Sequence, residues 1–387
     1  MLQIIFWSCV CILFYSYIGY GILLFFLIKI KNLFVKPIIF SGNFQPEVTL
    51  VVPCFNEALC IENKIKNCLA LDYPKDKIKF IFISDGSTDN TAELIKKYPE
   101  ILHLHELQRN GKAMAMNRAM LFVKSPIVLF SDANSELNKE SICEIVKHYE
   151  SPKVGAVTGE KRIIRAEKEG ASISGEGIYW KYESVLKQLD SDFYSIVGAA
   201  GELMSYRSEL YKELPQDTLL DDLMQSMDVA INGYQVVYEK NAWASETASL
   251  NIKEELKRKV RIAAGAWQSI FRLGKAMNPF RNFALSFTFI SHRVLRWTIA
   301  PLSLLILFIS NMILSIQLNG IYFDLMMLHT AFYTFAFLGW IFENKKIKTK
   351  IFFVPYYFFI MNLCMYLGLF RYLKGKQSAA WERAERA

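Results

Sequence analysis

Four long apolar runs, one at the N-terminal end and three near the C-terminal end, enclose a central region of mixed polarity. The first, Ile4–Ile28, runs for 25 residues without a formal charge. At ~1.5 Å per helical residue this is roughly 37 Å, enough to cross a ~30 Å hydrocarbon core. The others fall at Trp297–Leu318, Ile321–Phe342 and Ile351–Phe370. The sequence therefore predicts transmembrane helices at both ends of a chain whose middle folds separately.

Composition agrees with a folded domain joined to membrane segments. The 387 residues are 52% hydrophobic and 21% charged, which excludes a disordered chain or a small disulfide scaffold. The start, Met1-Leu2-Gln3, lacks the positive charge of a signal peptide, so we expect the first apolar run to stay as an anchor. The seven cysteines include no C-x-x-C pair, and we interpret them as reduced thiols rather than zinc ligands or disulfides.

The net charge of +8 is concentrated beside the membrane segments. Residues 251–275 hold seven basic and two acidic side chains, and apolar residues recur there at helical spacing: Leu256, Val260, Ala264, Trp267 and Phe271. This pattern predicts an amphipathic helix in the membrane interface. The partner implied by the charge is therefore a lipid bilayer and not a nucleic acid.

The side of the membrane follows from basic residues. Lysines 29, 31 and 36 follow the first run, which places the central region in the cytoplasm. With four spans, the lysines of 343–350 are also inside, but the basic tail after Phe370 falls outside. Either one apolar run is re-entrant or interfacial, or the tail tolerates the outer side, and both alternatives stay open.

The central region alternates strand and helix patterns. Strands are expected at Val48–Pro53, Lys79–Ser84, Ile101–Leu107 and Ile127–Ser131, and helices at Ile61–Leu71, Thr91–Tyr98, Lys112–Val123 and Lys139–Tyr149. This predicts an α/β fold with a mostly parallel sheet and helices on both faces. Ligands of such sheets bind beyond the carboxyl ends of the strands. Neither a G-x-G-x-x-G nor a P-loop motif occurs, so a dinucleotide fold and a P-loop are not supported.

Acidic residues follow several of these strands. Asp85 would point into the crevice and accept hydrogen bonds from a ribose or base, or would cap the next helix. Asp132 and Asn134, two positions apart, could hold a hard divalent cation, or form a solvated turn. The pair Asp221-Asp222 could cap a helix, or supply a general base whose pKa is raised by its neighbour.

Two arginines and two histidines add further candidates. Arg258 and Arg261, one helical turn apart, could bind lipid or neutralise a departing diphosphate. His103 and His105 point the same way on a strand but have no third metal ligand nearby, so we do not expect a metal there.

The order of these motifs resembles membrane-bound family 2 glycosyltransferases with a GT-A fold, of the cellulose, hyaluronan and poly-N-acetylglucosamine synthase type. The matching segments are Val51–Glu57, Ser84–Asp89, Arg109–Ala113 with Asn117, Asp132–Asn134, Gly198–Leu203 and Asp221-Asp222. The resemblance implies nucleotide-sugar binding by Pro53, Asn56, Glu57, Asp85, Lys112, Asn117, Arg258 and Arg261. It implies Mg²⁺ or Mn²⁺ at Asp132 and Asn134, where Asn134 replaces the family's second Asp, and acceptor binding by Gly198, Gly201 and Glu202. It makes Asp222 the catalytic base, with Asp221 beside it.

The family's Q-x-x-R-W motif is altered. The matching stretch keeps Arg261 but has Arg258 and Ile262 in place of Gln and Trp. The family's Trp helps to seat the acceptor sugar, and Trp267 could compensate. Processive chain growth and acceptor type are therefore open.

The resemblance implies an inverting glycosyltransferase that moves a sugar from a nucleotide-diphosphate donor, UDP-linked in the family, to a membrane-associated glycan or glycolipid. Alternatives are single-sugar transfer to a polyprenyl or other lipid, and a non-catalytic nucleotide-sugar sensor or scaffold. Partner subunits of a glycan synthesis system and a bacterial inner membrane, with the catalytic domain in the cytoplasm, are expected. The expected segments are an N-terminal transmembrane helix (1–30), a linker (31–46), a GT-A domain (47–250), interfacial helices (251–293), three transmembrane helices (294–370) and a basic tail (371–387).

Overall fold

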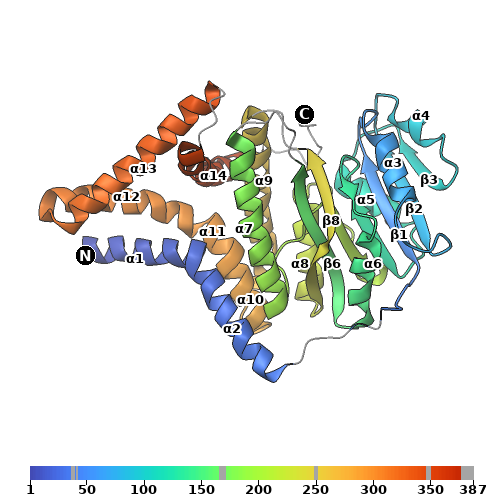
Figure 1. Ribbon diagram of the computed structural model, residues 1–387, viewed down its shortest axis with the longest axis horizontal. Coiled ribbons are helices and arrows are strands. Elements are labelled where there is room, and N and C mark those ends of the chain that lie inside the picture. The colour runs from blue at the N-terminus through green and yellow to red at the C-terminus, as the bar shows by residue number, and fades with distance from the viewer. Residues whose placement is uncertain (36–39, 41, 165–170, 248–251, 346–349, 376–387) are drawn as a thin grey trace.

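One eight-stranded sheet forms the centre of the molecule (Figure 1). The computed structural model describes residues 1–35, 40, 42–164, 171–247, 252–345 and 350–375. The strands are β1 (Val48–Cys54), β2 (Ile78–Asp85), β3 (Ile101–Glu106), β4 (Ile127–Ser131), β5 (Glu136–Leu137), β6 (Val154–Ile164), β7 (Leu203–Arg207) and β8 (Gln235–Thr247). Their spatial order is β3-β2-β1-β4-β7-β6-β8-β5. The expected α/β class is confirmed.

The sheet is parallel in one half and mixed in the other. Strands β3, β2, β1 and β4 pair in parallel, as the strand–helix alternation predicts. In the other half, β7 is antiparallel to both β4 and β6, while β6 and β8 are parallel. The carboxyl ends of the parallel strands meet at one edge, which brings the loops after β1, β2 and β4 together.

Apolar cores lie on both faces of the sheet. Alternate residues of β1 point to opposite sides, so that Val48, Leu50 and Val52 join one core and Val51 joins the other. The first core is covered by α3 (Ile61–Leu69), α4 (Thr91–Ile95) and α6 (Ser141–Val146), and the second by α5 (Lys112–Met120) and α8 (Asp221–Ile231). This burial on both sides explains the continuous apolar sequence of β1.

Two long helices join the sheet domain to the apolar helices. Helix α7 (Ala171–Phe193) packs along the N-terminal helix through Leu186, which lies in one buried cluster with Tyr20 and Leu24. The predicted amphipathic segment forms helix α9 (Ile252–Arg272). Short helices α10 (Phe283–Phe289) and α11 (Leu295–Trp297) follow it.

The apolar runs form the helices that the sequence predicts. The N-terminal helix extends over Leu2–Phe34, four residues past the expected boundary, and consists of α1 (Leu2–Phe14), a π-helical turn (Tyr15–Gly19) and α2 (Tyr20–Phe34). The π turn coincides with the bend between α1 and α2 (Figure 1). At the other end lie α12 (Ile299–Leu318), α13 (Ile321–Asn344) and α14 (Lys350–Leu373). Within the described residues, four helices are long and apolar enough to cross a membrane, which marks a membrane-associated protein.

Candidate active site

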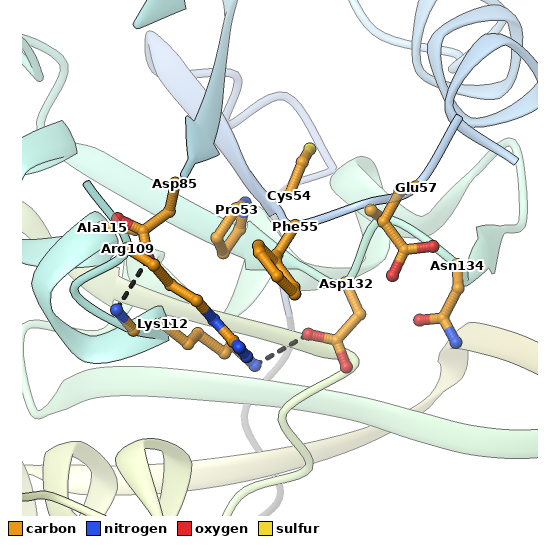
Figure 2. A pocket seen from close by; sticks show the side chains of 12 residues that line it. Pro53, Cys54, Phe55, Glu57, Asp85, Arg109, Lys112, Ala115, Asp132 and Asn134 are labelled. Carbon is orange, nitrogen blue, oxygen red and sulfur yellow. Dashed lines mark hydrogen bonds and ion pairs between the residues drawn. The ribbon is translucent and has the colours of Figure 1, made fainter. Parts of the chain in front are cut away.

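A pocket opens at the carboxyl ends of β1, β2 and β4 (Figure 2). It is lined by Pro53, Cys54, Phe55, Glu57, Asp85, Arg109, Gly111, Lys112, Ala115, Asp132, Ala133 and Asn134. These residues come from the three loops that sequence analysis singled out and from the start of α5. The parallel half of the sheet therefore brings together side chains as far apart in the sequence as Pro53 and Asn134.

Asp85 fixes the start of α5. Its carboxylate accepts the backbone N–H groups of Asn110, at 3.0 Å, and of Gly111, at 2.7 Å. Gly111 has a φ of 94°, a conformation that glycine adopts without strain. Asp85 thus lines the pocket and also sets where Lys112, the first residue of α5, enters it.

Lys112 lies among carboxylates. Its ammonium nitrogen is 2.7 Å from Asp132 Oδ1 and 3.4 Å from Asp221 Oδ2. Burial alone would lower the pKa of Lys112, but Asp132 and Asp221 outweigh it and hold this pKa well above its usual range. The lysine is therefore a permanent positive charge at the base of the pocket.

Asp222 is a half-buried acid near this lysine. It lies in the first turn of α8, and its Oδ1 accepts the N–H of Leu223 at 2.8 Å. Burial and the neighbouring Asp221 raise the pKa of Asp222 to about 6, against the opposing effect of Lys112. A carboxylate in this state can take a proton near neutral pH.

The glycine-rich segment closes on Asp222 from the other side. A Cβ at Gly201 would lie 3.3 Å from Asp222 Oδ2 and 3.5 Å from Lys112 Nζ, so glycine keeps this space open. Gly198 has a φ of 133°, and a Cβ there would lie 3.3 Å from a guanidinium nitrogen of Arg293. Glu202 makes an ion pair with Lys161, which also contacts Glu246. Gly201 thus borders both Asp222 and Lys112.

Asp132 and Asn134 lie in the loop after β4, and Figure 2 shows both side chains on the pocket side with Glu57. Within the described part of the chain, no group of three or more His, Cys, Asp or Glu residues is arranged to hold a metal ion. One carboxylate and one amide oxygen fit a cation that takes its remaining ligands from substrate phosphates and water, as Mg²⁺ commonly does. His103 and His105 instead both contact Ser84 Oγ, at 2.9 and 2.7 Å.

Comparison with known proteins identifies the domain that carries this pocket. Residues 49–214 match the sequence model of glycosyl transferase family 2. The chain therefore contains a glycosyl transferase family 2 domain. The match begins inside β1 and ends before α8, so it covers the residues that line the pocket.

Curated relatives and a solved structure are similar to this chain. The poly-beta-1,6-N-acetyl-D-glucosamine synthase of Staphylococcus aureus (strain COL) is 28% identical over 62% of this chain and 61% of its own length. The synthase of the same name from Staphylococcus epidermidis is 25% identical over 95% of this chain and 94% of its own. A mannosyltransferase from Pyrobaculum calidifontis, in complex with GDP-Man and Mn²⁺, has a TM-score of 0.70 at 20% identity and covers 97% of this chain and 100% of its own. This last likeness shows that the two proteins share a fold.

Not every predicted site residue of the glycosyltransferase lies in the pocket. Asn56 joins two loops, because its Oδ1 accepts the N–H of Thr88 at 2.7 Å and its own N–H donates to Ser87 Oγ. Asn117 is buried on α5, where its amide donates to Leu214 O at 2.8 Å and accepts from Leu214 N. Both side chains hold neighbouring loops, and neither lines the pocket as we expected.

Of the three predicted site residues on α9, Arg261 lies near the acids of the site, whereas Arg258 and Trp267 have other partners. Arg258 pairs with Glu255 through two hydrogen bonds of 3.0 and 3.1 Å. Burial lowers the pKa of Arg261, while Asp221 and Asp222 raise it, which places this guanidinium near the acids. Trp267 does not line the pocket, and its indole N–H donates to Met365 O on α14 at 3.0 Å. The expectation that Trp267 binds the acceptor is not supported by this geometry.

Arg109 and Phe55 are among the pocket residues that were not predicted from the sequence. The Arg109 guanidinium lies 3.7 Å from the centre of the Phe55 ring, and both side chains line the pocket. Gly86 permits this arrangement, since a Cβ there would lie 2.6 Å from the backbone nitrogen of Arg109. The signal was available, because Arg109 directly precedes the Asn-Gly-Lys motif and Phe55 follows β1.

Proposed function

We propose that this glycosyltransferase inverts the anomeric centre of a nucleotide-diphosphate sugar while it transfers the sugar to a membrane-associated glycan or glycolipid. The observation that carries the proposal is that Asp222, Lys112 and Asp132 lie together at the pocket: Asp222 Oδ2 and Lys112 Nζ both border Gly201, and Lys112 pairs with Asp132 at 2.7 Å. The pKa of Asp222, raised to about 6, suits a general base. The named relatives make poly-beta-1,6-N-acetyl-D-glucosamine, and the first of them is matched over 61% of its length. An exopolysaccharide or cell-envelope glycan is therefore the product class that we propose.

The donor would lie along the pocket at the strand ends. Pro53, Glu57 and Asp85 line the part nearest β1 and β2, where the nucleoside would bind. Lys112, with Arg261 from α9, would neutralise the diphosphate. A UDP-linked donor is proposed from the family resemblance alone.

A divalent cation, Mg²⁺ or Mn²⁺, would be held by Asp132 and Asn134 and would stabilise negative charge on the diphosphate when bound. The support from this chain is that the two oxygen ligands lie together on the pocket wall. The Mn²⁺ in the structure of the similar mannosyltransferase is consistent with such a site.

Asp222 would act as general base on the acceptor. It takes the proton of an acceptor hydroxyl, and the oxygen forms a bond to the anomeric carbon on the face opposite the diphosphate. The bond between that carbon and the diphosphate oxygen breaks, and its electron pair leaves with the nucleotide diphosphate. Gly201 leaves the space next to Asp222 in which the hydroxyl would lie.

The location that we propose is a bacterial inner membrane, with the catalytic domain on its cytoplasmic side. Lysines 29 and 31 at the end of the N-terminal helix support this orientation, because basic residues favour the cytoplasmic side. Lys31 also donates to the backbone oxygens of Asp192 and Phe193, so this end of the helix is joined to the catalytic domain. Partner subunits of a glycan synthesis or export system belong to the same proposal.

A second candidate is the transfer of a single sugar to a polyprenyl or other lipid. It is favoured by the altered motif on α9, where Ile262 replaces the acceptor-seating Trp and Trp267 packs against α14 instead. Product length under limiting acceptor separates the two candidates, because only a processive enzyme gives long products early.

The proposal is tested with the full chain purified in detergent. Release of nucleotide diphosphate is measured from a panel of sugar nucleotides, with Mg²⁺, Mn²⁺ or excess EDTA, for wild type and Asp222→Asn. Asp76→Asn, an exposed acid in the loop before β2, is the matched control. Metal-dependent release from one donor that only Asp222→Asn loses would support the proposal. Equal release by wild type and Asp222→Asn would contradict the assignment of the base.

A further inference from the structure

Helix α14 has basic residues at both ends. Four lysines precede or begin it, at 345, 346, 348 and 350, and Arg371, Lys374 and Lys376 lie at or after its other end. The loop between α12 and α13, by contrast, is the pair Asn319-Gly320, and residues 299–344 include no Lys or Arg. A helix that crossed the bilayer would carry one of its two basic groups to the far side, against the usual bias.

The far side of the membrane is marked by contacts of α1 with the start of α13. Phe6 and Trp7 contact Tyr322 through an edge-to-face ring pair and a 3.3 Å hydrogen bond. From Phe6 to Tyr17 the N-terminal helix rises by roughly 16 Å towards the catalytic domain. Tyr17 therefore lies at least about half-way from the α12–α13 loop to the catalytic side of a ~30 Å core.

The middle of α14 lies at the level of Tyr17. The Tyr17 hydroxyl donates to Asn362 Oδ1 at 2.8 Å, and its ring contacts Phe358. The Tyr17 backbone oxygen accepts from Tyr182 of α7, and the Arg296 guanidinium lies 5.8 Å from the Tyr17 ring centre. A cation and a catalytic-domain helix at this level indicate the membrane boundary rather than the bilayer centre.

The start of α14 lies beside the second half of α13. At its start, Phe352 contacts Phe335 and Phe342. The described ring contacts of α13 with α14 thus lie between residues 332 and 342, in the half of α13 away from the α12–α13 loop. Figure 1 agrees, since α1 and α12 lie along the page whereas α14 is seen nearly end-on.

The second half of α14 runs along α9, beside the catalytic domain. A Cβ at Gly368 would lie 2.5 Å from Ala263 Cβ, so the helices approach closely there. Tyr372 stacks on Phe271 at 5.7 Å between ring centres. Helix α9 in turn contacts the loop before α8, where Gln268 accepts the N–H of Leu219 at 3.0 Å. The C-terminal end of α14 therefore lies beside the catalytic domain.

One face of α14 is apolar and uncovered. In the second half of α14 the exposed residues Phe359, Leu363, Leu367 and Phe370 recur at helical spacing and form one stripe. Ile351 and Val354 are exposed in the first turn, whereas Phe353, Tyr356 and Cys364 are buried against the protein. A helix with one apolar face outward and basic residues at both ends fits the acyl-chain boundary of a single leaflet.

We propose that α14 lies in the plane of the bilayer, in the leaflet next to the catalytic domain, so that the chain crosses the membrane three times. In this arrangement lipid covers the exposed apolar residues of α14. The C-terminal end of α14 lies on the same side of the membrane as the active site. This arrangement resolves the conflict over the basic tail. It also makes α14 a membrane-bound support for α9, the helix that carries Arg261.

The test is labelling with a membrane-impermeant maleimide in sealed vesicles of both orientations. Lys374→Cys, Asn319→Cys and Asp76→Cys are compared, each in a full chain whose seven native cysteines are replaced by serine or alanine. We expect positions 374 and 76 to be labelled from one side and position 319 from the other. Labelling of positions 374 and 319 from the same side would show that α14 crosses, and would overturn the proposal.

A second measurement does not depend on the cysteine replacements. The wild-type chain with a C-terminal epitope tag is treated with protease in inside-out and right-side-out vesicles. Removal of the tag from the side on which the catalytic domain is also cleaved is the expected result. Removal from the opposite side alone would overturn the proposal, and neither result depends on catalytic activity.

Discussion

The ammonium nitrogen of Lys112 lies 2.7 Å from Asp132 Oδ1, and only 12% and 11% of the two side chains are exposed. The residue expected to bind the diphosphate and the residue expected to bind the metal are thus ion-paired with each other. The ion pair orients the Asp132 carboxylate towards Lys112. A nucleotide-sugar donor would bring a diphosphate that can pair with Lys112 and a cation that can pair with Asp132. The Lys112–Asp132 ion pair would then break without leaving either side chain unpaired.

Removal of this lysine is the first prediction. Lys112→Met leaves Asp132, Asp221 and Asp222 without their shared cation, so we expect a loss of about 3–5 kcal/mol in the free energy of unfolding. It also removes the charge that lowers the pKa of Asp222, which should shift the acidic limb of the rate–pH profile to higher pH. Thermal unfolding and initial rates across pH measure the two effects. Lys96→Met, in an exposed pair with Glu93, should change neither.

Asp222→Asn is the second prediction. An amide of the same shape cannot take the acceptor proton, so we expect the rate to fall by about 10²–10⁴-fold. Because the donor pocket is left intact, the affinity for the sugar nucleotide should change little, as measured by calorimetry. A rate within threefold of wild type would contradict the role given to Asp222.

The pH dependence of the wild type is the third prediction. Burial and Asp221 raise the pKa of Asp222 to about 6, and only its ionised form can accept a proton. The value of kcat/KM should therefore rise with pH through about 6 and then level off. A profile that stays flat from pH 5 to 7 would mean that another group limits the rate.

Much of this site could be predicted, because it depends on strand order. Once β1, β2 and β4 are parallel neighbours, residues after their ends must meet, and Asp85 and Asp132 do so. What could not be predicted depends on which face of a helix meets which neighbour. Asn117 follows Lys112 by five positions, yet it turns to Leu214 on a segment whose path the sequence pattern does not specify.

The membrane part shows the same division. Apolar length predicts that Ile351–Phe370 is helical, and α14 is helical there. Length and hydropathy contain no information on direction, however, and a 24-residue apolar helix can cross a bilayer or lie against one leaflet. The contacts of α14 with Tyr17 and α9 supply that information.

Metal dependence is the fourth prediction. Excess EDTA should abolish turnover, and Mg²⁺ or Mn²⁺ should restore it, because in the proposed site Asp132 and Asn134 would hold the cation only together with phosphate oxygens. Asn134→Asp replaces an amide oxygen with a carboxylate, so the metal concentration for half-maximal rate should fall by roughly tenfold, equivalent to ~1.4 kcal/mol. Robust activity in EDTA would contradict the metal site, and an unchanged metal requirement in Asn134→Asp would remove Asn134 from it.

Trp267 provides the last prediction, because its two possible roles differ in what they change. Trp267→Phe keeps an aromatic ring but loses the hydrogen bond to Met365 O, which costs about 0.5–1.5 kcal/mol. We expect the unfolding midpoint in detergent to fall by about 2–4 °C per kcal/mol, with little change in the rate of nucleotide release at saturating donor. Trp340→Phe, on an exposed part of α13, is the matched control and should alter neither quantity. If Trp267 instead binds the acceptor, the rate of nucleotide release will fall at least tenfold while the unfolding midpoint stays unchanged. That result would require α9 to rotate so that Trp267 leaves α14 and faces the pocket.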